Sequence, residues 1–179
     1  MPDARRSARH AAAAAALLLA ALVLNGCAAL FVRGDDVSDE ERQQIAEETA
    51  PYLAKGTGII TGVVRIETDY GAFVASRGTQ VALTPATTIA TERFQKYVVE
   101  DNELPAQRKA ELVLFTKTDA AGRFHFDQLP AGEYLLASPV RWSPTGKGED
   151  AHTEVPYARV TLGDGARVEV VVTRSIDDD

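Results

Sequence analysis

From Gly58 onward, apolar and polar residues alternate along the chain with a period of two. In the first run, Ile60, Val64 and Ile66 fall on one face of an extended chain and Arg65 falls on the other. Gly, Pro and Asp separate seven such runs: 58–66, 81–85, 112–117, 123–127, 133–138, 157–162 and 168–172. Short alternating runs bounded by turn residues are typical of an all-β sandwich, which is the fold class we predict.

Two segments depart from this alternation. Residues 38–41, Ser-Asp-Glu-Glu, fit a capping box with acidic side chains in the first turn, so we predict a short helix from Asp39 to Thr49 that ends near Pro51. Residues 87–109 form an insert with four apolar residues at near-helical spacing: Ile89, Phe94, Tyr97 and Val98. This spacing predicts a helix of one or two turns, followed by a mobile loop.

The first 26 residues have the layout of a secretory signal. Three Arg precede an uncharged stretch from Ala11 to Leu24, which is shorter than the roughly 20 apolar residues that span a bilayer. The next run, Leu24-Asn25-Gly26-Cys27, resembles the lipobox of bacterial lipoproteins, although Asn25 replaces the more usual Ala, Ser or Thr. The resemblance implies that Cys27 is acylated and becomes the first residue of the mature protein. An ordinary signal before an unmodified Cys27, or an uncleaved membrane anchor, remain alternatives.

The chain has 179 residues, of which 26 are acidic and 19 basic, giving a formal net charge of −7. Cleavage before Cys27 would remove three Arg and one Asp, so the charge of the mature protein would be −9. This balance argues against a general nucleic-acid-binding protein, which needs a basic surface. It also gives no attraction to anionic lipid headgroups, so the anchoring must come from the lipid. A single Cys excludes an internal disulfide.

The sandwich has a more specific resemblance in residues 118–134, TDAAGRFHFDQLPAGEY. This run is similar to the T-D-x-x-G-x-F-x-F-x-x-L-P-x-G-x-Y motif of carboxypeptidase-regulatory-like domains, which are transthyretin-like (prealbumin-like) β-sandwiches. The resemblance implies a seven-stranded sandwich in which Asp119 and Gly122 shape a turn and Phe124 and Phe126 fill the core. It implies little about activity, because these roles are structural. The domains expected are a signal peptide (1–26), a lipidated tether with a short helix (27–57), the sandwich (58–175) and an acidic tail (176–179).

A metal site is the sharpest catalytic hypothesis. His125 and Asp127 share one strand face, and His152 in a loop would complete two His and one carboxylate, the minimum for zinc. No spacing motif supports this site, and a solvated strand face explains the same residues. Two enzymes on this sandwich are excluded, because no His-x-His follows Tyr134 as in intradiol dioxygenases and no Tyr-Arg-Gly-Ser ends the chain as in hydroxyisourate hydrolases. The sequence therefore predicts neither an enzyme nor a cofactor.

A candidate binding rim flanks the loop at residues 143–154. Arg141 and Trp142 precede this loop, His152 lies within it and Tyr157 follows it. Aromatic residues and Arg are favoured at binding hot spots, although a Trp at a strand end is as often a core residue.

These observations lead to an expected function. We expect a non-catalytic lipoprotein of the bacterial cell envelope, whose sandwich acts as a scaffold for an envelope protein partner. The alternative is a module that binds a small ligand or glycan at the Arg141–Tyr157 rim. Because Ala28, not Asp, follows the Cys, resemblance to the lipoprotein sorting rule favours the outer membrane and a periplasm-facing domain.

Overall fold

The structure is a computed structural model that describes residues 28–31, 38–104, 112–145 and 150–176. The predicted signal peptide, Cys27 and the last three residues of the acidic tail lie outside these ranges. The strands are β1 (Ala28–Phe31), β2 (Gly58–Thr68), β3 (Gly71–Val74), β4 (Gln80–Pro85), β5 (Leu112–Lys117), β6 (Arg123–Leu129), β7 (Gly132–Ala137), β8 (Val140–Trp142), β9 (His152–Glu154), β10 (Tyr157–Leu162) and β11 (Arg167–Ile176). The helical segments are α1 (Asp39–Thr49), η1 (Ala50–Leu53), α2 (Thr88–Phe94) and the π-helical turn η2 (Gln95–Glu100).

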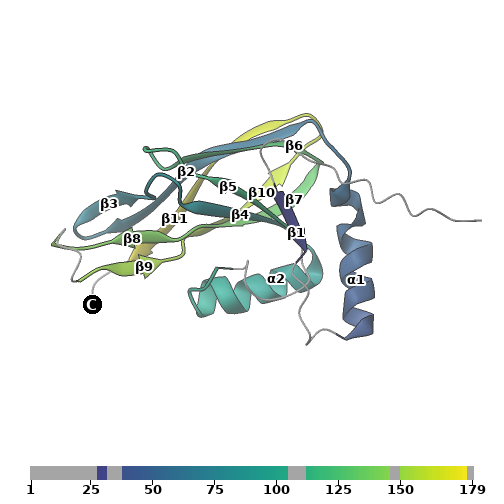
Figure 1. The fold of residues 1–179 in the computed structure, drawn as a ribbon, viewed down its shortest axis with the longest axis horizontal. Coiled ribbons are helices and arrows are strands. Elements are labelled where there is room, and N and C mark those ends of the chain that lie inside the picture. The colour runs from purple at the N-terminus through teal and green to yellow at the C-terminus, as the bar shows by residue number, and fades with distance from the viewer. Residues whose placement is uncertain (1–27, 32–37, 105–111, 146–149, 177–179) are drawn as a thin grey trace, which may run out of the picture.

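Nine of these strands form one curled sheet. Its order is β1-β5-β4-β7-β10-β11-β2-β3, and β6 pairs with the first half of β2. Between β10 and β11 the sheet is joined by a single residue pair, Tyr157 with Thr173, and its two halves lie over one another (Figure 1). The core contains buried residues of both halves: Ile60, Val64 and Phe126 from one, and Leu83, Leu136 and Leu162 from the other. This arrangement is consistent with the predicted all-β sandwich.

The longest pairing in the sheet is parallel and joins the first and last strands of the sandwich. It runs over ten residue pairs, from Ile59 with Arg167 to Thr68 with Ile176. Gly62 lies within it, and a Cβ at this position would come within 2.0 Å of the carbonyl oxygen of Val170. A side chain at Gly62 would therefore push the two strands apart.

All seven predicted runs contain a strand, but the structure has further strands that the sequence did not predict. β3, β8 and β9 are short, and β8 and β9 form a separate hairpin. β1, at the start of the predicted tether, pairs antiparallel with β5 at the end of the sheet. Backbone pairing with β5 therefore extends the sheet to within one residue of Cys27.

The turn predicted at residues 118–122 is built as expected. The carboxylate of Asp119 accepts hydrogen bonds from the N–H groups of Ala121 and Arg123, at 2.8 and 2.9 Å. Gly122 has a φ of +70°, in the left-handed region that favours glycine. Thr118 is buried and its hydroxyl donates to the carbonyl of Ser76, which connects this turn to the loop before β4.

The second half of the motif holds the N-terminal segment against the sandwich. The hydroxyl of Tyr134 donates to the carbonyl oxygen of Pro130 at 2.8 Å, and only 1% of this residue is exposed. The ring of Tyr52, in η1, packs edge-on against Tyr134 with 5.4 Å between centroids. Gly132 leaves space for this ring, because a Cβ there would lie 2.5 Å from a Tyr52 carbon.

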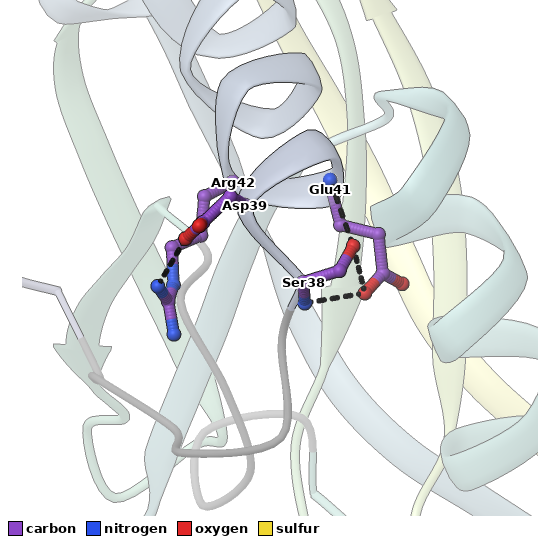
Figure 2. A network of polar contacts seen from close by, with 4 residues as sticks. All are labelled: Ser38, Asp39, Glu41 and Arg42. Atoms are coloured by element: carbon purple, nitrogen blue, oxygen red, sulfur yellow. Dashed lines mark hydrogen bonds and ion pairs between the residues drawn. The ribbon is translucent and has the colours of Figure 1, made fainter.

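Helix α1 has the predicted bounds and the predicted cap. Figure 2 shows that the side chain of Ser38 accepts from the N–H of Glu41, while the Glu41 carboxylate accepts from the N–H of Ser38. Ile45 of α1 contacts Ile89 of α2. The Glu48 carboxylate also accepts from the N–H of Thr88 at 2.6 Å, at the first residue of α2.

The helix in the insert is longer than predicted, because η2 continues α2 directly to Glu100. Its apolar side packs on the outer face of β7, where Phe94 and Val98 contact Leu135 and Ala137. Both faces of β7 are therefore buried, and the insert forms a third layer over the sheet (Figure 1). Residues 105–111, most of the predicted mobile loop, lie outside the described residues. Among the described helices, none is long and apolar enough to cross a membrane.

The Tyr134 hydroxyl provides a test of the second half of the motif. We expect Tyr134→Phe to lower the free energy of unfolding by about 1 kcal/mol, because the carbonyl of Pro130 loses its partner inside the protein. Urea denaturation followed by circular dichroism would measure this change. Tyr157→Phe is the matched control, because the Tyr157 hydroxyl makes no hydrogen bond with any residue that the structure describes. Equal effects of the two variants on the free energy of unfolding would contradict a stabilising role for the Tyr134 hydroxyl.

The Asp119 turn predicts a dependence of stability on pH. Hydrogen bonds from the Arg123 and Ala121 N–H groups lower the pKa of Asp119 from its ordinary value of 3.8. A carboxyl whose pKa falls on folding stabilises the protein above its unfolded-state pKa, and this contribution disappears as pH falls through the folded-state pKa. We expect Asp119→Asn to melt below the wild type at neutral pH, by a difference that shrinks as the pH is lowered below about 4. Scanning calorimetry at several pH values would measure it.

Asp164→Asn is the control for this experiment. Asp164 lies exposed in the turn between β10 and β11 and accepts no hydrogen bond from the part of the chain that the structure describes. Its replacement should leave the melting temperature nearly unchanged at every pH. A deficit of Asp119→Asn that stayed constant down to about pH 2 would show that the carboxylate charge is unimportant.

Candidate binding site

The four residues of the predicted rim do not share one surface. Trp142 and His152 are cross-strand partners in the β8–β9 hairpin, and Arg141 is exposed beside them. Tyr157 instead packs edge-on against Phe94 of α2, with 5.9 Å between ring centroids. It therefore belongs to the layer beneath the insert, and the predicted Arg141–Tyr157 rim is divided between two parts of the fold.

Trp142 is the centre of a cluster that we call the aromatic end, formed by Tyr70, Phe73, Trp142 and His152. The ring centroids of Phe73, His152 and Tyr70 lie 5.5, 5.2 and 6.3 Å from that of Trp142. Trp142 itself is only 6% exposed, whereas Tyr70 is 57% exposed. The indole therefore closes the core at this end of the sandwich, and only its neighbours are available to a ligand.

Asn102 fixes the position of this hairpin, a role that the sequence did not indicate. Its side chain accepts from the N–H of Val155 at 2.8 Å and donates to the carbonyl of Thr153 at 3.1 Å. The Asn102 oxygen also accepts from Arg174 of β11 at 3.1 Å. Asn102 adopts a φ of +57°, in the left-handed region that Asn, Asp and Gly adopt more readily than other residues.

The residues of the metal hypothesis are likewise separated. His125 and Asp127 lie together on β6, with 3.6 Å between Nε2 and Oδ2, and both are about half exposed. His152 is stacked on Trp142 in the aromatic end instead. Within the part of the chain that the structure describes, no group of three or more His, Cys, Asp or Glu side chains is placed to hold a metal ion.

A cavity lies on the outer face of β2, β6 and β11. We call it the sheet groove; it has a volume of about 760 Å³ and is lined by Thr61, Val63, Arg123, Phe124, Arg167 and Glu169. On β2, Ile60 and Val64 point into the core, so Thr61 and Val63 between them point outward. The registers place Val63 opposite Arg123 on β6 and Thr61 opposite Glu169 on β11.

A second, smaller hollow of about 360 Å³ adjoins the sheet groove. The two share Arg123 and Phe124, and the smaller one adds Lys117, Asp119 and His125 among its lining residues. Phe124 is 4% exposed and its ring packs in the core, so at this surface Arg123 contributes a charged wall and Val63 an apolar one. The combined surface follows the outer face of the sandwich from β11 across to the β5–β6 turn.

The basic side chains of this surface are not neutralised within the described residues. Arg123, Arg167 and Lys117 take part in none of the ion pairs found there, whereas Arg65 and Arg159 are paired with carboxylates at 2.8 and 2.5 Å. Unpaired guanidinium groups retain their donors for a ligand. The arrangement can therefore bind groups that accept hydrogen bonds or carry negative charge.

The sequence did not reveal the sheet groove, because its walls come from three separate segments. The alternation at residues 123–127 identified Arg123 and His125 as one outward face, but not what lies beside it. Arg167 and Glu169 reach the site only through the parallel pairing of β11 with β2. That pairing joins residues about a hundred positions apart and has no local signature.

Comparison with known proteins gives one informative similarity. No protein-family model and no curated protein matches the chain. A candidate carbohydrate-binding protein from Pseudomonas aeruginosa is similar in structure, with a TM-score of 0.56 and 27% sequence identity, over 72% of this chain and 95% of that protein. The minor pilin of Streptococcus agalactiae gives a TM-score of 0.36 and 13% identity, over 68% of this chain and 45% of the pilin, which is too distant to bear on function. The fold is therefore compatible with a binding or scaffold module.

Proposed function

We propose that this chain is a lipid-anchored protein of the bacterial cell envelope whose β domain binds carbohydrate in the sheet groove. The observation that carries the proposal is the groove itself, which combines Arg123 and Arg167, unpaired among the described residues, with the acceptor Glu169 and the outward-facing side chain of Val63. The similarity to a candidate carbohydrate-binding protein over 95% of that protein supports it. The domain would act by binding, without catalysis.

The chemistry of the lining suits a sugar. Each sugar hydroxyl is both a donor and an acceptor, so it pairs well with a guanidinium, a carboxylate and a hydroxyl placed around one cavity. Arg123, Glu169 and Thr61 supply one of each. The C–H faces of a sugar ring are apolar, and the outward-facing side chain of Val63 offers them contact area.

The fold is further proposed to be the prealbumin-like sandwich of carboxypeptidase-regulatory-like domains. In support, the motif residues behave as that family's pattern requires. Asp119 and Gly122 form the turn, and Phe124, Phe126 and Leu129 are buried in the core. These residues explain the fold and leave the outer face of the sheet free to vary in function.

The envelope location rests on residues 1–27, and β1 gives it a structural consequence. Because β1 begins at Ala28 and pairs with β5, an acylated Cys27 would be attached directly to the last strand of the sheet. Two or more acyl chains suffice for stable anchoring. The sandwich would then be held at the bilayer by its β1–β5 edge, with little freedom to move away from it.

A scaffold that contacts an envelope protein is the second candidate. β3 favours it, because this strand ends the sheet and pairs only with β2 in the described sheet. Strand edges can accept a strand from a partner. Val74 of β3 and Val171 of β11 are also 46% and 42% exposed, which provides apolar contact area.

The glycan proposal predicts a thermal shift. Peptidoglycan fragments and neutral and acidic oligosaccharides would be screened against the mature protein in detergent, and a ligand should raise the melting temperature. A ligand at a hundred times its dissociation constant stabilises by about 2.7 kcal/mol. Thr61→Tyr, which fills the groove from an outward position on β2, should abolish the shift.

Thr161→Tyr is the matched control, because Thr161 is an exposed strand residue on β10, outside the lining of the sheet groove. It should leave the shift intact. A shift that survives Thr61→Tyr but disappears in Tyr70→Ala would move the site to the aromatic end. No shift with any sugar, together with a stoichiometric envelope protein recovered after cross-linking, would favour the scaffold.

The lipid anchor has its own test. Intact mass spectrometry of the protein from membranes should show a mature chain that begins at an acylated Cys27. Cys27→Ser should leave the precursor uncleaved, whereas Asn25→Ala, which moves the sequence toward the commoner lipobox, should be processed normally. An unmodified Cys27 would refute the anchor without affecting the glycan proposal.

A further inference from the structure

The sheet groove has a charge that differs from the rest of the molecule. The chain as a whole carries a formal net charge of −7. The groove and the adjoining hollow bring together Arg123, Arg167 and Lys117 against only Glu169 and Asp119. This surface therefore has an excess of positive charge on an acidic protein, and it will attract anions that the rest of the surface repels.

One of the two carboxylates is already engaged within the fold. The Asp119 oxygen accepts from the N–H groups of Ala121 and Arg123, so it is committed to its turn. Glu169 is the one carboxylate of the sheet groove, on the same face of β11 as Arg167. The guanidinium groups of Arg123 and Arg167 thus remain the strongest unpaired charges of the site.

The two guanidinium groups stand on opposite sides of β2. Arg123 pairs with Val63 on one edge of this strand, and Arg167 pairs with Ile59 on the other. Strand spacing puts their Cα atoms roughly 16 Å apart, about 13 Å along the strand and about 10 Å across it. A small anion would meet one guanidinium at a time. A ligand that uses both must carry negative groups at intervals along an extended chain.

Glu169 restricts which kinds of negatively charged polymer can bind in the groove. A carboxylate in the groove would repel a dense polyanion such as polyphosphate or nucleic acid, but it would accept hydrogen bonds from hydroxyls. Val63, which points outward on β2, provides an apolar surface between the charges. An oligosaccharide with carboxylates separated by hydroxyl-bearing, apolar-faced rings satisfies all of these conditions.

We propose, on the basis of the function proposed above, that the sheet groove binds an acidic oligosaccharide of the uronic acid type, with Arg123 and Arg167 each holding a carboxylate. Guanidinium and carboxylate form charge-assisted, often bidentate hydrogen bonds. Glu169 and Thr61 bind hydroxyls of the same chain. The carboxylates of the ligand thus select it, and its rings pack against Val63.

Calorimetric titration of the mature protein in detergent tests this inference. The probes are an oligogalacturonate of several residues, its methyl ester, which has the same rings without the charge, and monomeric galacturonate. The acidic oligomer should bind at least about tenfold more tightly than the ester or the monomer. Its affinity should fall steeply as salt rises from about 0.1 M to about 1 M, where screening acts over about 3 Å.

Arg123→Gln and Arg167→Gln should each weaken binding of the acidic oligomer by about tenfold. Arg159→Gln is the matched control, because it removes the same charge from an exposed strand position that is paired with Glu133 and lies outside the groove. It should change affinity less than twofold. Melting temperatures of all three variants would confirm that each is folded.

The outcomes separate this inference from the proposed function. If the ester binds as tightly as the acid, or if neither Arg variant differs from Arg159→Gln, the acidic specificity is wrong and a neutral sugar remains the ligand class. Tighter binding of polyphosphate or single-stranded DNA than of oligogalacturonate would also overturn it. If no oligosaccharide binds, acidic or neutral, both the inference and the proposed function fail.

Discussion

The parallel pairing of β2 with β11 is the constraint on which the rest of the structure depends. It joins the first and last strands of the sandwich over ten residue pairs and leaves the other edge of β2 for β6 and β3. Gly62 permits the close approach, because any side chain there would collide with the Val170 carbonyl. The same pairing places Arg167 and Glu169 beside Thr61, so the sheet groove exists only while these strands are paired.

The motif at residues 118–134 and the insert stabilise the other parts of the domain. The Asp119 turn and the Tyr134 hydroxyl satisfy backbone groups at the two ends of β6, and the ring of Tyr52 packs where Gly132 has no side chain. The helical insert covers β7 from outside, which explains why this strand is apolar on both faces. The motif and the helical insert therefore have structural roles.

This division of roles moves the candidate function from the loops to the outer face of the sheet. Trp142 closes the core and contacts His152 of the 143–154 segment. Tyr157 packs against Phe94 instead, so these residues do not form one rim. The outer face of β2, β6 and β11 carries the sheet groove, where Arg123 and Arg167 form no ion pair among the described residues of this acidic protein. A rigid sheet is a favourable place for a binding site, because its backbone holds the side chains in a defined register.

Local chemistry in the sequence determined seven of the described strands and helix α1, but did not reveal β1, β3, β8 or β9. Period-two alternation predicted all seven runs that became strands, the capping box predicted α1 to the residue, and the Asp and Gly of residues 118–122 predicted their turn. Only the tertiary structure decided which edges pair, that Leu135 and Ala137 are buried beneath α2, and that Trp142 and Tyr157 face different layers. The physical reason is the distance along the chain between the residues that interact. A strand or a cap depends on neighbours within a few residues, whereas the groove depends on contacts between Thr61, Arg123 and Glu169, which are far apart in the chain.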